Sequence, residues 1–301
     1  QDGVWIVDGG MQRLADGLTA CAQSLGVTFR FGAHVSTIDV DRGRASGVSL
    51  SDGTRLEAAT VICNADPASL ASGLFGYAAA SSVPPSSPSN RSLSAVTWAI
   101  RGKAHSFPLI RHNVFFSDDY TSEFDAILKN GTLPNDPTVY VCAQDRDGTA
   151  GNAEDERMLV LANAPALGDT REFTTAELDT CETNVFNRLR RCGLEITQAT
   201  MTRTTPADFN RLFPATGGAL YGRATHGWAA SFSRPGSRTK IPGLYLAGGG
   251  VHPGAGIPMA ALSGQQAALS ALADRASIFR SRRAAMPGGT STRSATTNSR
   301  A

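Results

Sequence analysis

The segment with the clearest chemical pattern runs from Ile241 to Gly264 and reads IPGLYLAGGGVHPGAGIPMAALSG. The apolar run LYLA predicts a short buried strand, and three glycines at 248–250 then leave a backbone that a ligand can approach closely. Pro258 fits the first turn of a following helix that carries Leu262, Leu269 and Leu272 on one face. The free N–H groups and partial positive charge at the start of such a helix favour an electron-rich ligand beside the glycine turn.

This string resembles the C-terminal flavin-contacting motif of the bacterial-type phytoene desaturases, whose members show the pattern GLYLxGxGxHPGxGxP. The resemblance implies an FAD cofactor, with Gly249 and Gly250 beside the ribityl chain. The N–H groups around residues 257–259 would face the N1/C2=O edge of the isoalloxazine, where a helix start stabilises negative charge. Val35 would offer its backbone to the adenine, and a plain core valine is the alternative at that position. The implied cofactor-binding residues are Val35, Gly248, Gly249, Gly250, His252, Gly254, Gly256, Ile257, Pro258 and Met259.

Two further strings, FPATGGALYGRATHGW and GVWIVDGGMQRLADGL, resemble the hydroxyneurosporene or methoxyneurosporene desaturase branch of that family. The resemblance implies desaturation of an acyclic C40 carotenoid, with a 1-hydroxy or 1-methoxy group, at C3–C4. A hydride would pass to flavin N5 and a proton would leave the neighbouring carbon. The alternatives are a carotenoid isomerase or an amine-oxidase-like flavoenzyme, and a non-catalytic lipid-binding remnant. The amine reading is less favoured because Lys103, Lys129 and Lys240 all lie outside the glycine turn.

Three residues are candidates for catalysis by proton transfer: His226, His252 and Tyr221. His226 and His252 are the titratable residues of the recognised strings that are suited to remove a proton, and an apolar pocket would disfavour their charged form. For His252, packing beside the flavin is the more probable role. No catalytic residue is therefore assigned from the sequence.

Composition bounds the remaining possibilities. The chain has 301 residues, 41% hydrophobic content and a net charge of +2, which fits a globular protein and gives no reason to expect a nucleic acid partner. No apolar stretch is long enough to span a bilayer, so we expect at most peripheral contact with the inner face of the cell membrane. Five scattered cysteines without CxxC spacing predict reduced thiols in the cytoplasm and no zinc site.

The beginning of the chain resembles the middle of a longer protein. QDGVWIVDGG is not a signal peptide, and no GxGxxG dinucleotide fingerprint occurs. We therefore expect a C-terminal fragment of an FAD enzyme, and such a fragment on its own can be inactive.

The predicted fold class is α/β: a partial FAD-binding Rossmann-like domain with an inserted α+β substrate domain. The expected divisions are an FAD-binding part at 1–66, a substrate domain at 67–225, the C-terminal flavin motif at 226–273 and a basic, disordered tail at 274–301. In the first part we expect a helix from Met11 to Leu25, a strand around Phe29–Phe31, a β-meander over 35–62, and Asp66 as a helix cap.

The predicted substrate domain combines short strands with one long helix. Strands are expected at 93–100, 114–116, 138–143 and 158–164, and a helix at 174–192 with Thr174 and Glu177 as a capping box. A Ser/Pro-rich segment at 78–90 predicts a flexible surface loop. Six aromatic side chains could line an apolar channel, although a core position is more common for strand aromatics. They are Trp98, Phe107, Phe115, Phe116, Tyr120 and Phe124.

Overall fold

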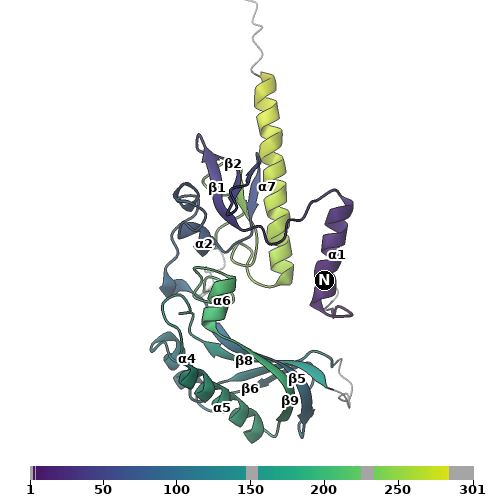
Figure 1. Ribbon diagram of the computed structural model, residues 1–301, viewed down its shortest axis with the longest axis vertical. Coiled ribbons are helices and arrows are strands. Elements are labelled where there is room, and N and C mark those ends of the chain that lie inside the picture. The colour runs from purple at the N-terminus through teal and green to yellow at the C-terminus, as the bar shows by residue number, and fades with distance from the viewer. Residues whose placement is uncertain (1–2, 4, 147–154, 225–233, 285–301) are drawn as a thin grey trace, which may run out of the picture.

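The chain folds into a glycine-motif part and a separate sheet domain (Figure 1). The computed structural model describes residue 3 and residues 5–146, 155–224 and 234–284, with side chains to residue 277. The glycine-motif part contains α1 (Met11–Ser24), β1 (Val35–Asp41), β2 (Arg44–Leu50), β3 (Arg55–Glu57), β4 (Val61–Cys63), α2 (Pro67–Ala71), α3 (Tyr77–Ala80), β10 (Leu244–Leu246) and α7 (Ile257–Ala284). The sheet domain contains β5 (Ser94–His105), β6 (His112–Phe115), α4 (Tyr120–Leu128), β7 (Val139–Ala143), β8 (Glu156–Ala164), α5 (Thr175–Arg191), β9 (Glu195–Thr204) and α6 (Pro206–Leu212).

A two-stranded parallel sheet, β4 with β10, joins the two ends of the glycine-motif part. Leu244 pairs with Val61 and Leu246 with Cys63, and the N–H of Ala247 donates to the carbonyl of Cys63 at 3.1 Å. Because the strands are parallel, their carboxyl ends lie at the same edge of the sheet. The glycines at 248–250 therefore follow β10 next to the residues that follow β4.

The meander β1–β2–β3 packs on this parallel pair. Ile38 and Ala45 share a buried cluster with Leu244, Leu246 and Val251, and the N–H of Ala45 donates to the carbonyl of Pro242 at 3.0 Å. The glycine turn thus lies against the region around β1, as the flavin interpretation requires.

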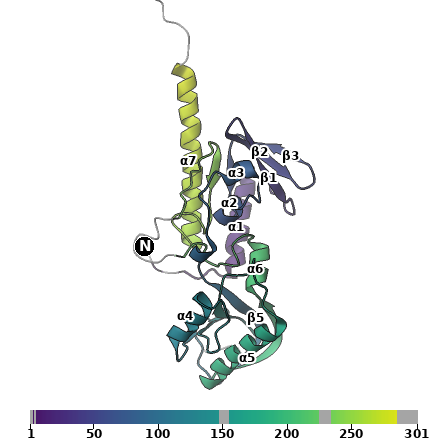
Figure 2. The same cartoon turned by 90° about the vertical axis from the view of Figure 1, so that its left-hand side faces the viewer.

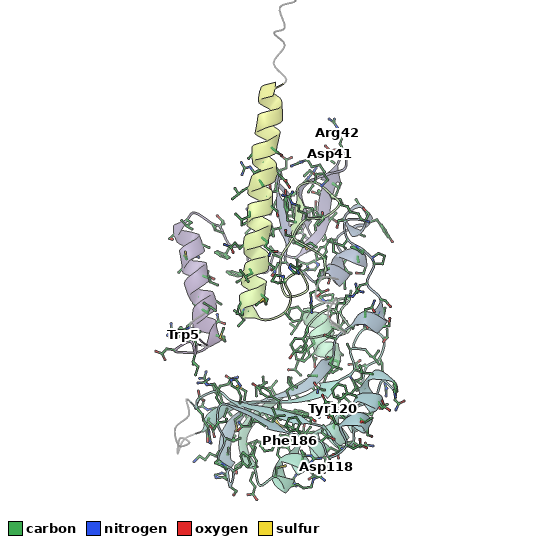
Figure 3. The ribbon with its side chains drawn as sticks, turned by 180° about the vertical axis from the view of Figure 1, so that it is seen from behind. Trp5, Asp41, Arg42, Asp118, Tyr120 and Phe186 are labelled. Atoms are coloured by element: carbon green, nitrogen blue, oxygen red, sulfur yellow. The ribbon has the colours of Figure 1, made fainter. Side chains whose placement is uncertain are left out.

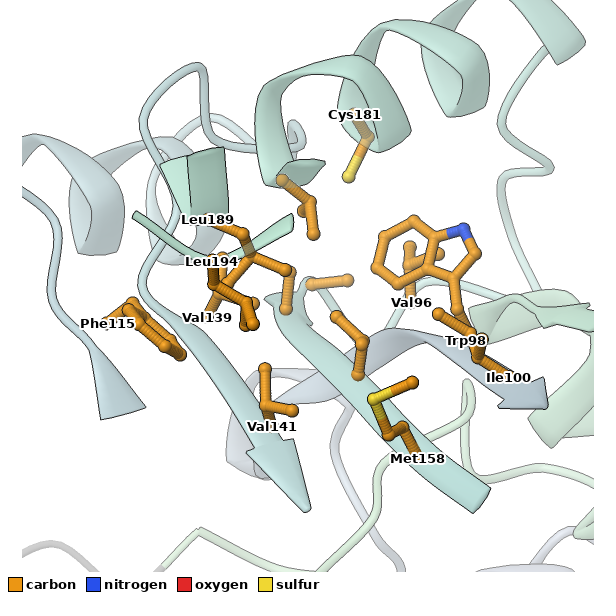
Figure 4. Packing of buried hydrophobic residues seen from close by; sticks show 14 of the residues in the cluster. Val96, Trp98, Ile100, Phe115, Val139, Val141, Met158, Cys181, Leu189 and Leu194 are labelled. Carbon is orange, nitrogen blue, oxygen red and sulfur yellow. The ribbon is translucent and has the colours of Figure 1, made fainter. Parts of the chain in front are cut away.

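The sheet domain is an antiparallel sheet with the strand order β6-β7-β8-β5-β9. One face packs on α5 through a large apolar cluster that includes Trp98, Val160, Val185 and Leu189 (Figure 4). The predicted capping box of α5 is confirmed, since Thr174 and Glu177 exchange hydrogen bonds. In Figures 1 and 2, α5 lies on the side of the sheet that is turned away from α7.

Two expectations for the first part and the end of the chain are wrong. No strand forms at residues 27–31. Phe29 and Phe31 instead stack on each other, with ring centroids 5.7 Å apart. The strand is absent because no strand of the described chain lies beside these residues to complete a ladder. The last helix continues through residues 274–284, which were expected to be disordered; this stretch holds four arginines and has no glycine or proline to stop it.

Helix α1 forms as predicted, but none of its residues is buried. Its apolar side chains Met11, Leu14 and Leu18 are exposed, as is Trp5 before it. Figure 3 shows Trp5 at one end of this helix, which stands apart from α7. The amphipathic pattern therefore predicts the helix correctly but not a partner for it within the described residues.

The Ser/Pro-rich segment is more ordered than expected. It begins in α3 and ends in a short 3-10 helix (Pro88–Asn90), and Ala79 and Val83 are buried in the core beneath the parallel pair. Residues 84–90 are exposed, as a surface loop should be.

The six aromatic residues do not line one channel. Trp98 and Phe115 are buried core residues and Phe107 packs against them, whereas Phe116 and Tyr120 are exposed. Phe124 contacts Tyr120 with ring centroids 4.6 Å apart. The core interpretation is confirmed for the strand residues Trp98 and Phe115.

The parallel pair gives a direct test of what holds the glycine turn. We expect Leu246→Ala, at a side chain that is 1% exposed, to lower the free energy of unfolding by about 2–5 kcal/mol. Ile62→Ala, in the paired strand but 46% exposed, should cost clearly less. Urea unfolding of the two variants is the measurement, and equal losses would contradict this packing.

Candidate functional site

The glycine turn after β10 approaches its neighbours too closely for side chains at two of its three glycines. A Cβ on Gly248 would lie 2.8 Å from the Asn64 side-chain nitrogen, and one on Gly250 would lie 2.7 Å from a carboxylate oxygen of Asp66. Gly249 has ordinary room, with its nearest neighbour at 3.6 Å. Gly248 and Gly250 are therefore needed for the packing of the turn itself, whereas Gly249 is not.

Helix α7 begins where the sequence predicts. It starts at Ile257 with Pro258 in its first turn, and the N–H groups of Ile257 and Met259 have no acceptor within the helix. Ser263 connects the helix to the glycine turn, because its hydroxyl accepts from the Gly248 N–H at 2.8 Å and donates to the Ala260 carbonyl. The turn and the positive end of the helix are thus held as one unit.

A buried arginine, Arg234, connects the turn to the sheet domain. Its guanidinium donates to the carbonyl of Gly249 at 3.0 Å and to the carbonyls of Tyr221 and Arg223 at 2.9 and 3.0 Å. Burial lowers the pKa of this guanidinium, and the charge of Asp66 acts in the opposite direction. A cation is therefore fixed beside the glycine turn by three neutral carbonyls.

Asp66 caps α2, as predicted from the sequence. Its carboxylate accepts from the N–H of Ala68 at 2.8 Å. Burial raises the pKa of Asp66, while the Ala68 N–H and the charges of Arg234 and Arg91 oppose that shift. The Asp66 carboxylate lies close to Gly250, so it limits the size of any group that approaches the glycine turn from that side.

A cavity of about 280 Å³ lies where the turn meets the sheet domain, and its lining includes Gly250, Gly222, Arg91 and Val83. A Cβ on Gly222 would lie 3.4 Å from the Cα of Gly250, so the two backbones are in near contact. The glycine turn therefore faces the sheet domain without intervening side chains at this point.

The face of the sheet opposite α5, which we call the open face, carries two rows of side chains across the five strands. Registered pairs place Val114, Tyr140, Leu161, Thr97 and Thr204 in one row and His112, Cys142, Leu159, Ala99 and Thr202 in the next. Leu159, Leu161 and Tyr140 are only half-buried, and Val114 is 48% exposed. The open face is a partly exposed, mainly apolar surface on the side of the sheet turned toward α7 (Figures 1 and 2).

The structure brings most of the predicted cofactor residues together. Gly248, Gly249 and Gly250 form the turn, and Gly254 lies against the Arg234 side chain, with a Cβ position 3.4 Å from its Nε. His252 donates its backbone N–H to the Pro235 carbonyl and precedes a cis Pro253. Gly256, Ile257, Pro258 and Met259 lead into and form the first turn of α7.

The other predicted residues are less closely connected. Val35 lies at the start of β1 and pairs with Leu50, so its contact with an adenine stays a prediction. Tyr221 is 57% exposed, and His226 lies outside the described residues. Sequence reasoning missed Arg234 and Ser263: the serine stands in the recognised string, whereas no local pattern marks the arginine.

The donor set suits a flavin. The first turn of α7 offers N–H groups that have no acceptor within the helix, and Ile257, Met259 and Leu262 beside them are 54%, 39% and 44% exposed, an apolar surface on which a flat ring can rest. A Cβ on Gly256 would meet open space. Among the described residues, no cluster of His, Cys, Asp or Glu is arranged to hold a metal ion. The described helices likewise include none that is long and apolar enough to cross a membrane.

Comparison with known proteins identifies desaturases among the relatives. The chain is 51% identical to a hydroxyneurosporene desaturase of Rubrivivax gelatinosus, over 98% of this chain and 57% of that protein. It is 42% identical to the hydroxyneurosporene desaturase of Rhodobacter capsulatus, over 91% of the chain and 55% of that protein. A 1-hydroxycarotenoid 3,4-desaturase of Flavobacterium is 32% identical over 87% of the chain. The chain therefore spans little more than half the length of these relatives, and the predicted resemblance to the hydroxyneurosporene branch is confirmed.

The fold and the family agree with these relatives. An oxidoreductase structure from Methanosarcina mazei matches with a TM-score of 0.50 at 16% identity, over 85% of this chain and 53% of that one, which supports the α/β fold alone. A family model described as flavin containing amine oxidoreductase matches residues 1–272. The predicted FAD cofactor is thereby confirmed, and the predicted oxidoreductase class is the class of the matched family. The chain belongs to the flavin-containing amine oxidoreductase family.

Proposed function

We propose that this chain serves in the FAD-dependent desaturation of an acyclic carotenoid, with a 1-hydroxy or 1-methoxy compound dehydrogenated at C3–C4. The observation that carries the proposal is the glycine turn fixed against the positive start of α7, in a chain whose relatives at 42–51% identity are hydroxyneurosporene desaturases. The chain spans 57% of the first of these relatives, so the activity is assigned to it as part of that machinery.

A bound flavin would supply the acceptor for a hydride from the substrate. The chain's own residues would hold and polarise it: Gly249 would present backbone with its Cβ position at ordinary contact distance from Ala255, and the N–H groups of Ile257 and Met259 at the start of α7 would stabilise negative charge on the flavin. The charge of Arg234 adds a second positive group near the turn. Because these groups are fixed before reaction, they stabilise the charge without reorganisation.

The substrate would be oriented by packing. A carotenoid hydrocarbon chain offers no charge, so it must be bound by apolar area and by exclusion of water. The open face supplies Val114, Leu159 and Leu161 in two adjacent rows on the side of the sheet turned toward α7. A long apolar molecule bound on this face would lie on the side of the sheet turned toward α7.

We further propose that the protein works in the cytoplasm with peripheral contact to a membrane. A C40 substrate partitions into lipid, and six arginines with no acidic residue lie between residues 275 and 301 of the sequence. Each such cation near an anionic surface contributes about 1 kcal/mol.

The redox reaction itself tests the proposed function. The purified chain should carry flavin, and anaerobic addition of a 1-hydroxylated acyclic carotenoid should bleach the flavin's visible absorption while the carotenoid spectrum moves to longer wavelength. Both changes are recorded in one absorbance experiment. A protein that binds flavin but leaves both spectra unchanged would overturn the assignment, and an amine that bleaches the flavin instead would favour an amine oxidase.

The three glycines of the turn predict an unequal response to substitution. Gly250→Val should weaken flavin binding by at least tenfold, because its side chain would collide with Asp66 and Pro67 and displace the turn. Gly249→Ala serves as the matched control: its Cβ stays at ordinary contact distance from the protein, so loss of flavin there would show that the ligand itself occupies that space. Flavin fluorescence titration measures both variants, and wild-type affinity in Gly250→Val would contradict the proposed geometry.

Arg234 gives a second, electrostatic test. We expect Arg234→Leu to lower the free energy of unfolding by about 3 kcal/mol, because three carbonyls lose their charged donor, and to weaken flavin binding as the turn loosens. Arg223→Leu is the control, since this exposed neighbour lines the same cavity without a hydrogen bond from its side chain among the described contacts. Urea unfolding and flavin titration on both proteins check the expectation. Equal effects of the two changes would contradict the proposed role of Arg234 in holding the glycine turn.

A further inference from the structure

The open face carries a hydrogen-bonded pair of side chains within its two rows, formed by His112 in β6 and Tyr140 in β7. The imidazole Nδ1 and the phenol oxygen are 2.7 Å apart, and the two rings stack at 6.1 Å with an interplanar angle of 16°. The neighbours of this pair in the two rows are Val114, Leu161, Cys142 and Leu159. A hydrogen-bonded pair held in this surface is poorly suited to pure hydrocarbon, so it calls for a ligand with a polar atom.

The pair holds one N–H or O–H proton more than the bond between the two side chains uses. Neutral histidine and tyrosine together hold two N–H or O–H protons, and the bond between them uses one. If Tyr140 donates to Nδ1, the proton of His112 is on Nε2, where it can be donated to a ligand. If Nδ1 donates instead, the Tyr140 hydroxyl proton can go to the Cys142 side chain, with which Tyr140 also forms a hydrogen bond, or to a ligand.

The hydroxyl of Tyr140 also stays protonated. Burial raises its pKa to about 12, and the nearby Cys142 and Tyr221 act in the same direction. Tyr221 directly precedes Gly222, which almost touches Gly250 of the glycine turn. Tyr140 is therefore within electrostatic range of Tyr221, which stands next to the glycine that faces the glycine turn.

We propose that His112 and Tyr140 donate a hydrogen bond to the oxygen near the reacting end of the carotenoid and so select oxygenated over hydrocarbon substrates. A donor fits this task because a hydroxyl and a methoxy oxygen both accept hydrogen bonds, whereas only the hydroxyl can donate one. The apolar rows beside the pair would hold the polyene. This inference rests on the proposed function, since it concerns the substrate of that same site.

Two carotenoids of equal length, one 1-hydroxylated and one the parent hydrocarbon, test the proposal. Quenching of tryptophan fluorescence in detergent micelles gives the two dissociation constants for the 301-residue chain. We expect the hydroxylated compound to bind about tenfold more tightly to the wild-type protein, the ratio that one hydrogen bond supports. In the double variant His112→Leu/Tyr140→Phe the ratio should fall to about one, with binding of the hydrocarbon unchanged.

Tyr120→Phe is the matched control, because it removes the hydroxyl of an exposed tyrosine in α4 and should keep the tenfold ratio. Thermal unfolding of the double variant should match the wild type, since His112 is exposed and Tyr140 only half-buried. Equal binding of the two carotenoids to the wild type, or an unchanged ratio in the double variant, overturns the selective role alone. Loss of both affinities by the same factor shows a packing role and also overturns it. If neither carotenoid binds the wild type, the proposed function fails together with this inference.

Discussion

The parallel pairing of β4 with β10 is the constraint on which the site depends. It joins segments far apart in the chain, as the hydrogen bond from Asn64 to the Ala247 carbonyl, 183 residues away, illustrates. Parallel strands end at a common edge, so α2 and the glycine turn begin side by side. The close approaches at Gly248 and Gly250, the position of Asp66 and the attachment of α7 through Ser263 all follow from this edge.

Two charged groups at this edge, Arg234 and Asp66, are held mainly by uncharged backbone groups. Arg234 is held by carbonyls, and Asp66 is held by a backbone N–H, so each keeps its charge available to the surroundings. Burial disfavours the ionised form of both groups, and each favours the charge of the other. Since field strength rises where water is excluded, this arrangement acts on a neighbouring ligand more strongly than surface charges would.

The sequence predicts those parts of the site that depend on local backbone chemistry. The glycine turn, the Pro258 start of α7, the Asp66 cap and the Thr174–Glu177 capping box each need only neighbouring residues, and each is found. Arg234 could not be predicted, because its three acceptors lie 11 to 15 residues away in the sequence and no local pattern joins them to it. The strand expected at 27–31 is absent for a similar reason. Alternation of apolar and polar residues fits a strand, but a strand also needs a neighbouring strand with which to pair.

The two faces of the sheet domain show how tertiary context gives a pattern its meaning. Strand β8, ERMLVLANA, is apolar at consecutive positions, which is typical of strands buried on both sides. Met158 and Val160 are indeed buried under α5, but Leu159 and Leu161 on the open face are only half-buried. Leucines that stay partly exposed in the middle of a sheet cost hydrophobic free energy. An apolar molecule on the open face would cover these side chains and recover that free energy. The open face would then provide the binding energy for a polyene.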